Sequence, residues 1–276
     1  MKKWFLLLPA LLFALACVGQ KEDPEEEPGP VDPGTVVDPG TGSEEGTRPF
    51  HRILALEFTA SWCQYCPNMA AALAEAMTAR PGRIVDIAVH QYDDISPAEA
   101  DAIVALFKAS GFPQMVFDWD GGTMFNEQSA GRILDYVDAT VDSPACNIAL
   151  ESSFADGKLQ AKVTVRADEA ASYSVAAALV QDRMVVDQVG YGPGYSCMSV
   201  LRQFLGAGMD GESLGSLEKE AEKAFTFTAE ISTGEAPEAD FRVVAFVRRN
   251  GRVVNAVTGP LNGKIDYQYE NEEVTD

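Results

Sequence analysis

The chain has few of the residues that metal and nucleic-acid sites require. Its two histidines, His51 and His90, stand far apart, and no second Cys-x-x-Cys pair accompanies Cys63 and Cys66. A zinc site is therefore disfavoured, and we expect neither a metal nor a cofactor. Lysine and arginine number 21 against 42 aspartates and glutamates, for a formal net charge of −21. Nucleic acid and anionic lipid are poor partners, because both are bound through clustered basic residues.

The N-terminus lacks an apolar run long enough for a transmembrane helix. Lys2 and Lys3 precede the apolar segment 4–16, and Cys17 follows at once. This pattern predicts a bacterial signal peptide over 1–16. A cysteine directly after the apolar segment resembles the lipobox of bacterial lipoproteins, which implies lipidation of Cys17. The fit departs at Ala14, where leucine is usual, so secretion with removal of Cys17 is the alternative.

Residues 17–47 are acidic, rich in proline and glycine, and nearly free of apolar side chains. Such a segment cannot bury a core and is predicted to act as a disordered linker. The acidic run after Cys17 resembles the export signal of certain surface lipoproteins. We therefore expect an outer-membrane lipoprotein, either surface-exposed or facing the periplasm, held by its N-terminal lipid.

The segment 48–142 alternates strands and helices. Apolar strands are expected at 53–58 and 84–89, a hairpin at 114–125, and helices at 63–79, 96–109 and 128–141. The first two strands are apolar through most of their length, as in a sheet covered by helices on both faces. The second helix is expected to begin in a capping box with proline at its first position, over 96–99.

Cys63 and Cys66 are the candidate reacting groups. Two cysteines three residues apart on the first turn of a helix can close into a disulfide and reopen. Unpaired N–H groups at a helix start favour a thiolate, and thiol–disulfide exchange needs that species. We expect Cys63 to be a partly exposed nucleophile and Cys66 to be the resolving thiol; a static disulfide is the alternative.

The segment Phe58-Thr59-Ala60-Ser61-Trp62-Cys63-Gln64-Tyr65-Cys66-Pro67, with Glu57 six residues before Cys63 and Pro113 after Gly111-Phe112, resembles the thioredoxin family. Most of the mature chain is similar to thioredoxin-like outer-membrane lipoproteins of Gram-negative bacteria with a C-terminal β-domain, and the active-site segment carries the motif.

The resemblance implies roles for several residues. Glu57, which the period-two pattern places on a buried face, would exchange a proton with Cys66. Pro113 would form a cis bond, and Phe112 would present its backbone to a bound peptide. Trp62 would shield the disulfide, and Tyr65 would either contact a partner or pack on the helix. His90 is expected to make a local hydrogen bond.

Residues 143–268 have a different rhythm. Strands are expected over 147–154, 159–167, 173–181, 184–189, 225–231, 241–247 and 252–257, with short helices at 199–205 and 216–223. The prediction is an α/β thioredoxin-like domain followed by an antiparallel β-sandwich domain, then an acidic tail at 269–276. Cys146 and Cys197 form a possible structural disulfide; two free thiols are the alternative.

Two hypotheses follow for function. The first is a membrane-anchored thiol–disulfide oxidoreductase acting on cysteine-containing proteins or peptides. The second is a non-catalytic surface lipoprotein, an adhesin or complex subunit, that uses the thioredoxin-like part as a scaffold. The sequence leaves the oligomeric state open.

Overall fold

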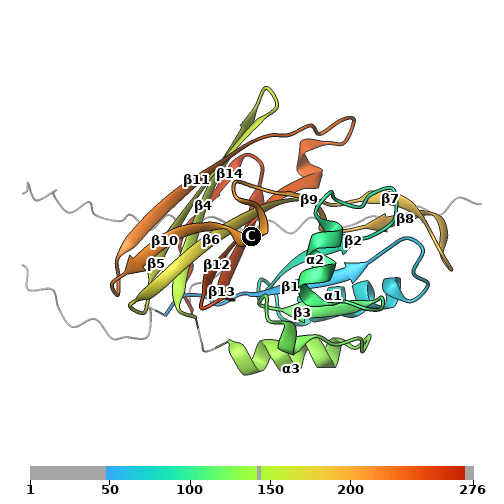
Figure 1. Cartoon of the computed structure of the whole chain (residues 1–276), viewed down its shortest axis with the longest axis horizontal. Helices are drawn as coiled ribbons and strands as arrows, with labels where there is room; N and C mark the ends of the chain where they lie inside the picture. The colour runs from blue at the N-terminus through green and yellow to red at the C-terminus, as the bar shows by residue number, and fades with distance from the viewer. Residues whose placement is uncertain (1–47, 142–143, 271–276) are drawn as a thin grey trace, which may run out of the picture. The chain divides into compact units, whose positions relative to one another are not determined.

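The computed structural model describes residues 48–141 and 144–270 (Figure 1). The expected signal peptide, the lipidated Cys17, the linker up to residue 47 and the last six residues lie outside the described part. Within that part the chain is mostly β-sheet, with three α-helices. No helix there is long and apolar enough to cross a membrane.

The N-terminal half follows the expected alternation. Its elements are β1 (Ile53–Thr59), α1 (Cys66–Ala79), β2 (Ile84–His90), α2 (Ala100–Phe107), β3 (Gln114–Phe117) and α3 (Ala130–Thr140). β1 pairs in parallel with β2 and antiparallel with β3. An isolated bridge between Met115 and Phe125 closes the expected hairpin. All seven residues of β1 and of β2 are buried, which explains their near-continuous apolar sequence.

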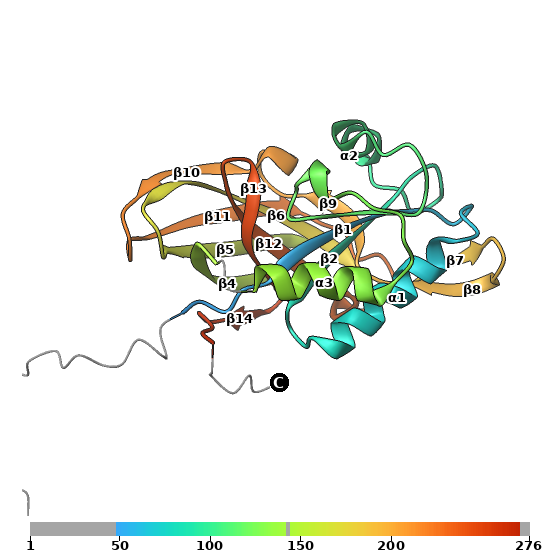
Figure 2. The same ribbon diagram turned by 90° about the horizontal axis from the view of Figure 1, so that it is seen from below.

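Helices cover both faces of this part of the sheet. Met69 and Leu73 of α1 and Ile133 of α3 pack with Ile53 and Ala55 on one face. On the other face, Ile103 and Phe107 of α2 pack with Leu54, Leu56 and Phe58. Figure 2 shows α1 and α3 on the same side of β1. Alternate residues of β1 thus belong to different cores, and Glu57 falls on the α1 face.

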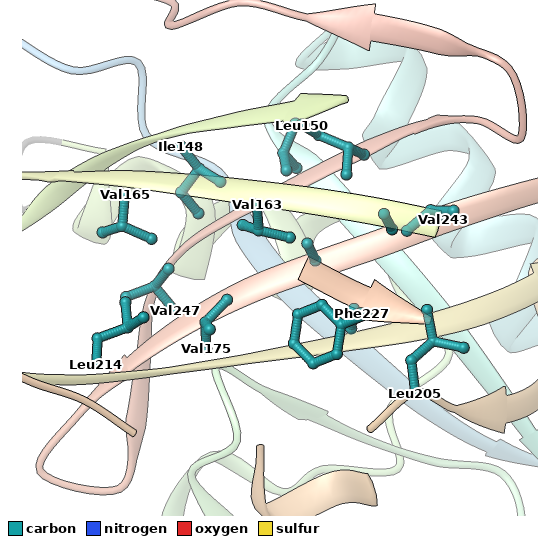
Figure 3. Packing of buried hydrophobic residues seen from close by; sticks show 14 of the residues in the cluster. Ile148, Leu150, Val163, Val165, Val175, Leu205, Leu214, Phe227, Val243 and Val247 are labelled. Atoms are coloured by element: carbon teal, nitrogen blue, oxygen red, sulfur yellow. The ribbon is translucent and has the colours of Figure 1, made fainter. Parts of the chain in front are cut away.

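The C-terminal half is built from strands. They are β4 (Cys146–Ala155), β5 (Lys158–Ala167), β6 (Ala171–Gln181), β7 (Met184–Gln188), β8 (Gly192–Cys197), β9 (Val200–Phe204), β10 (Glu212–Leu217), β11 (Glu222–Glu230), β12 (Phe241–Arg249), β13 (Arg252–Pro260) and β14 (Gly263–Ile265). β11-β5-β4-β14 form a four-stranded sheet. It packs against one face of β6, β12 and β13 through residues such as Ile148, Val163, Phe227 and Val243 (Figure 3).

One sheet runs through both halves. Its order is β13-β12-β6-β9-β2-β1-β3, with β10 also paired to β6. β9 is the joint: it pairs antiparallel with β6 and meets β2 in parallel at Val200 and Ala88. The expected layout of two separate domains is therefore not confirmed, because this sheet joins the described residues of both halves into one compact unit.

The helix expected at 199–205 is wrong, and its residues form β9. Val200 and Leu201 are fully buried, and the edge of β2 would otherwise leave backbone groups unpaired. The helix expected at 216–223 is also wrong. Ser216 and Leu217 pair with β6 instead.

Two other boundaries differ from expectation. α2 begins at Ala100 rather than at the 96–99 box, because the Ser96 hydroxyl is bonded to Asp93. The acidic tail does not begin at 269. Tyr269 bridges to Pro49, and Glu270 forms a two-point ion pair with Arg83 at 2.6 and 2.7 Å.

Candidate active site around the Cys63–Cys66 disulfide

Cys63 and Cys66 are joined in a disulfide where the chain leaves β1. α1 begins at Cys66, with Tyr65 at its N-cap and Pro67 in its first turn, so Cys63 precedes the helix. The expectation of a partly exposed Cys63 is wrong: Cys63 is 4% exposed and Cys66 is 2% exposed. Phe112 packs against the pair and covers it.

The Phe112–Pro113 peptide bond is cis, as expected. The Phe112 ring stacks on the indole of Trp62, with centroids 5.4 Å apart and planes at 17°. The indole Nε1 donates to the Gln91 carbonyl at 2.8 Å. Trp62 and Tyr65 remain 47% and 58% exposed, so these rings are available to a partner.

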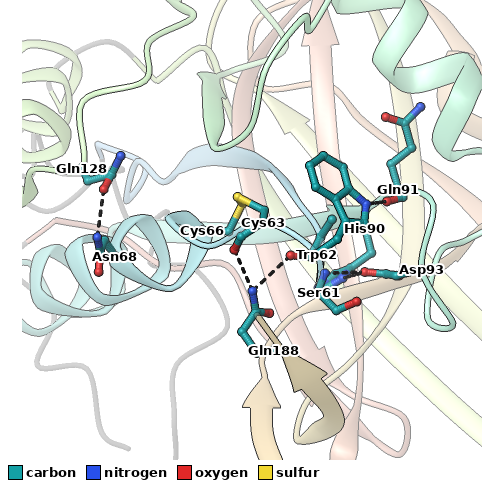
Figure 4. The surroundings of a disulfide bond; sticks show 11 residues. Ser61, Trp62, Cys63, Cys66, Asn68, His90, Gln91, Asp93, Gln128 and Gln188 are labelled. Carbon is teal, nitrogen blue, oxygen red and sulfur yellow. Dashed lines mark hydrogen bonds and ion pairs between the residues drawn. A yellow bond between two sulfur atoms is a disulfide. The ribbon is translucent and has the colours of Figure 1, made fainter. Parts of the chain in front are cut away.

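Gln188, at the end of β7, is a site residue that the sequence reasoning missed. Its side-chain Nε2 donates to the Cys63 carbonyl at 2.7 Å and to the Ala60 carbonyl at 3.3 Å (Figure 4). Pro67 has no N–H, so the Cys63 carbonyl lacks the usual helical donor four residues on. Gln188 supplies a donor from more than 120 residues away. The missing donor was visible in the sequence, but its replacement was not.

The loop after β2 holds the other side of the cysteine loop. The Asp93 carboxylate accepts the Ser61 N–H at 2.7 Å and pairs with His90 Nδ1 at 2.7 Å. Burial opposes the charge of Asp93, but the hydrogen bond and charge of His90, with the other donors, outweigh it and hold its pKa below the ordinary value. His90 therefore has the local hydrogen-bonding role expected of it.

Glu57 is buried, as predicted. It is 4% exposed, and its Oε1 has no hydrogen-bond partner among the described residues. Burial, together with the nearby Asp86, raises the pKa of Glu57 to about 8. Glu57 and Cys66 border the same pocket, of about 620 Å³. A carboxyl that titrates near neutral pH can exchange a proton with a thiol through water in such a pocket.

Cys146 and Cys197 are both free, so the possible disulfide between them is not formed. They belong to different clusters: Cys146 packs in the sandwich core, whereas Cys197 packs with Ile95 and Val200. Burial raises the pKa of the Cys197 thiol to about 12, and that of Cys146 further. Among the described residues no group of His, Cys, Asp or Glu is arranged to hold a metal ion.

The parallel β1–β2 pair, the antiparallel β3, the disulfide before α1 and the facing cis-proline together define a thioredoxin-like fold with a Cys-x-x-Cys site. No family model and no curated protein matches the sequence. Among solved structures, the chain is similar to HBP35 of Porphyromonas gingivalis, with a TM-score of 0.66 and 18% identity over 77% of this chain and 76% of that one. It is also similar to protein AGR_C_4864 from Agrobacterium tumefaciens, with a TM-score of 0.53 and 15% identity over 78% and 96%. At these identities the likeness concerns the fold.

Proposed function

We propose that this protein is a thiol–disulfide oxidoreductase that acts on cysteine-containing proteins or peptides. The observation that carries the proposal is that Cys66 shares a pocket with Glu57, a buried acid whose Oε1 has no hydrogen-bond partner among the described residues, while aromatic side chains beside the disulfide stay exposed. A disulfide serving only as a clip would need neither feature. It would also add little stability, since a separation of three residues closes a very small loop.

In the reductive direction, the Cys63 thiolate attacks a substrate disulfide. A bond forms between Cys63 and one substrate sulfur, and the other sulfur leaves as a thiolate and takes a proton from water. Cys66 then passes its proton to the Glu57 carboxylate and attacks Cys63. The Cys63–Cys66 disulfide forms, the mixed disulfide breaks, and Glu57 returns the proton to the departing thiolate through water. The enzyme dithiol is oxidised, and the substrate disulfide is reduced to two thiols.

The exposed apolar rim supports a polypeptide substrate. Trp62, Tyr65, Tyr92 and Tyr191 are large, exposed side chains on segments that meet at the cysteine loop. Tyr191 of the β7–β8 connection donates its hydroxyl to Asn68 of α1 at 3.0 Å. Such rings give contact area with few rotatable bonds. Substrates would approach on the Phe112 side, where the cis-proline loop faces the disulfide.

We place the protein at the outer membrane through the lipid on Cys17, as the N-terminal sequence predicts. Anchoring is tested by metabolic labelling with a fatty acid, comparing the natural chain with Cys17→Ser. Label retained by Cys17→Ser would contradict it.

The reduction potential of the Cys63–Cys66 pair tests the proposed activity. A value between about −270 and about −120 mV is that of a working oxidoreductase, and its position gives the direction of transfer. A pair that stays oxidised below about −300 mV is a structural disulfide. That result favours the alternative of a non-catalytic surface lipoprotein, for which the burial of both cysteines is the supporting observation.

A further inference from the structure

The pocket behind Cys66 is a groove between α1 and the β7–β8 hairpin. One wall is α1 from Cys66 to Met77, including Ala70 and Ala74. Met77 follows Cys66 by eleven helical steps of 1.5 Å, so this wall is about 16 Å long and the groove is elongated. The other wall is formed by Tyr191, Tyr195 and Met198. Small side chains on one wall and aromatic ones on the other leave an apolar channel wide enough for an aliphatic chain.

Two carboxyl groups form the floor of this groove. Glu57 comes from β1 and Asp86 from β2, and they are 4% and 8% exposed. Each has an oxygen without a hydrogen-bond partner among the described residues: Glu57 Oε1 and Asp86 Oδ1. Glu57 is paired with Ala88, two residues after Asp86. The two carboxyl-bearing positions are therefore diagonal neighbours on adjacent strands, about 8 Å apart.

Two basic residues, Arg242 and His90, also line the groove, and both are bonded to other acids. Arg242 is held by Asp182 through contacts of 2.8 and 3.0 Å, and it also donates to Ser199 and Thr258. His90 is paired with Asp93. Burial raises the pKa of both Glu57 and Asp86, even though the charge of Arg242 acts against the shift at Asp86. Asp86 also has a side-chain hydrogen bond with Ser199. A buried carboxyl oxygen without a partner is costly, and Glu57 and Asp86 each have one such oxygen at this groove.

We propose that this groove binds an aliphatic diamine or polyamine, whose ammonium groups contact Glu57 and Asp86 while its methylene chain lies along α1. An ammonium group carries three donors and no acceptor, so it complements carboxyl oxygens that lack donors. Two such groups at the ends of a short chain match two acids spaced along a groove. A monoamine satisfies one acid, and a neutral diol supplies no charge. Binding does not depend on thiol–disulfide activity.

The test is calorimetric titration of the full chain, with its disulfide closed, using cadaverine and spermidine. Pentane-1,5-diol, which has the length of cadaverine without its charge, is the matched probe. We expect saturable binding of both amines at one site and none of the diol. Absence of saturable amine binding, or equal binding of the diol, would overturn the proposal.

Variants localise the binding. Asp86→Asn should weaken cadaverine binding at least tenfold, whereas Asp138→Asn, an exposed acid paired with Arg80 outside the groove, should leave it unchanged. Ala74→Phe should abolish binding by filling the groove from an exposed position, where the fold tolerates the change. Thermal unfolding of each variant checks folding. Equal weakening by Asp138→Asn, or full affinity in folded Ala74→Phe, would contradict the assignment.

Discussion

Cys63 and Cys146 are buried to a similar degree but lie in different surroundings. Both cysteines are at least 96% buried. Cys146 lies in the sandwich core among apolar residues, where burial raises the pKa of its thiol far above the ordinary value. Cys63 lies in a loop whose backbone is held by Gln188, and the neighbouring Ser61 is held by Asp93. The two cysteines therefore differ in the hydrogen bonds made by the backbone around them, and not in their exposure.

Asp118 and Glu57 are two buried acids that also differ in the hydrogen bonds around them. Burial raises the pKa of Asp118 to about 7. Its two oxygens accept the Leu54 N–H at 2.8 Å and the Tyr136 hydroxyl at 2.9 Å, so it is a structural group with its bonds made. Glu57 differs, because its Oε1 has no hydrogen-bond partner among the described residues and it borders the same pocket as Cys66. A buried polar group without a hydrogen-bond partner is the stronger candidate for a functional role.

Cys63→Ser is expected to have the largest effect on activity, and it tests the comparison between Cys63 and Cys146. It should lower the rate of protein-disulfide reduction by roughly 10³-fold or more, because no mixed disulfide can form at serine. Cys146→Ala should leave that rate within about twofold. The measurement is thiol release from a protein disulfide with a small dithiol as electron donor. Comparable loss in both variants would remove the distinction between the two thiols.

Glu57→Gln should slow resolution of the mixed disulfide by roughly 10²-fold, since the base for Cys66 is lost. In the natural chain the resolution rate should rise with pH through about 8, as Glu57 ionises. The variant should lose that inflection. Rapid-mixing kinetics of substrate thiol release across pH 6–9 provide the profile. An inflection near 8 that persists in Glu57→Gln would assign it to another group.

Glu57 also makes stability depend on pH. Its folded pKa, about 8, lies above the ordinary 4.5, so the folded state holds a proton that the unfolded chain has released. The contribution is fully present below pH 4.5 and is lost as pH rises through about 8. We expect the free energy of unfolding to fall as pH rises between these two values. The slope of this fall against pH should be smaller in Glu57→Gln. Urea unfolding at pH 5, 7 and 9 measures it, and identical slopes would argue against a buried, neutral Glu57.

Gln188→Leu should loosen the cysteine loop without touching either sulfur. Removing the amide leaves the Cys63 carbonyl with only the Cys66 N–H at 3.4 Å. The loss of a buried donor costs about 1–3 kcal/mol, and the disulfide should be reduced roughly tenfold faster by a small thiol. Gln160→Leu, at an exposed position of β5, is the matched control. Equal reduction rates in the natural chain and both variants would show that Gln188 does not stabilise the cysteine loop.

Cys146→Ser should have the smallest effect, confined to stability. It places a hydroxyl in the sandwich core, at a cost of about 1–3 kcal/mol, whereas Cys146→Ala should cost about 1 kcal/mol. Urea midpoints measure both. A rise in stability for the serine variant would mean that Cys146 is less enclosed than its surroundings indicate.

Much of the fold and of the site could be predicted from local patterns. The strands β1 and β2 follow from apolar runs, the burial of Glu57 follows from a period of two, and most sandwich strands follow from alternation. The cis bond before Pro113 follows from the resemblance to the thioredoxin family. β9 could not be predicted: its sequence suits a helix as well, and only the open edge of β2 makes it a strand. Gln188 and Asp93 were missed because their roles depend on distant carbonyl and N–H groups.

By itself the sequence determined that two cysteines three residues apart follow a buried strand, with an acid on that strand's helix-covered face and a proline to oppose them. The cysteines, the acid and their strand are separated by a few residues, so the geometry of the covalent backbone fixes their relation. The facing proline is distant in the chain and was expected from the resemblance to the thioredoxin family. Only the tertiary structure decided that the two halves share one sheet, that a glutamine from the β7–β8 hairpin replaces the donor lost at Pro67, and that Cys146 and Cys197 stay apart. Contacts between residues so far apart in the chain depend on which edges and orphaned groups remain once the local elements have packed.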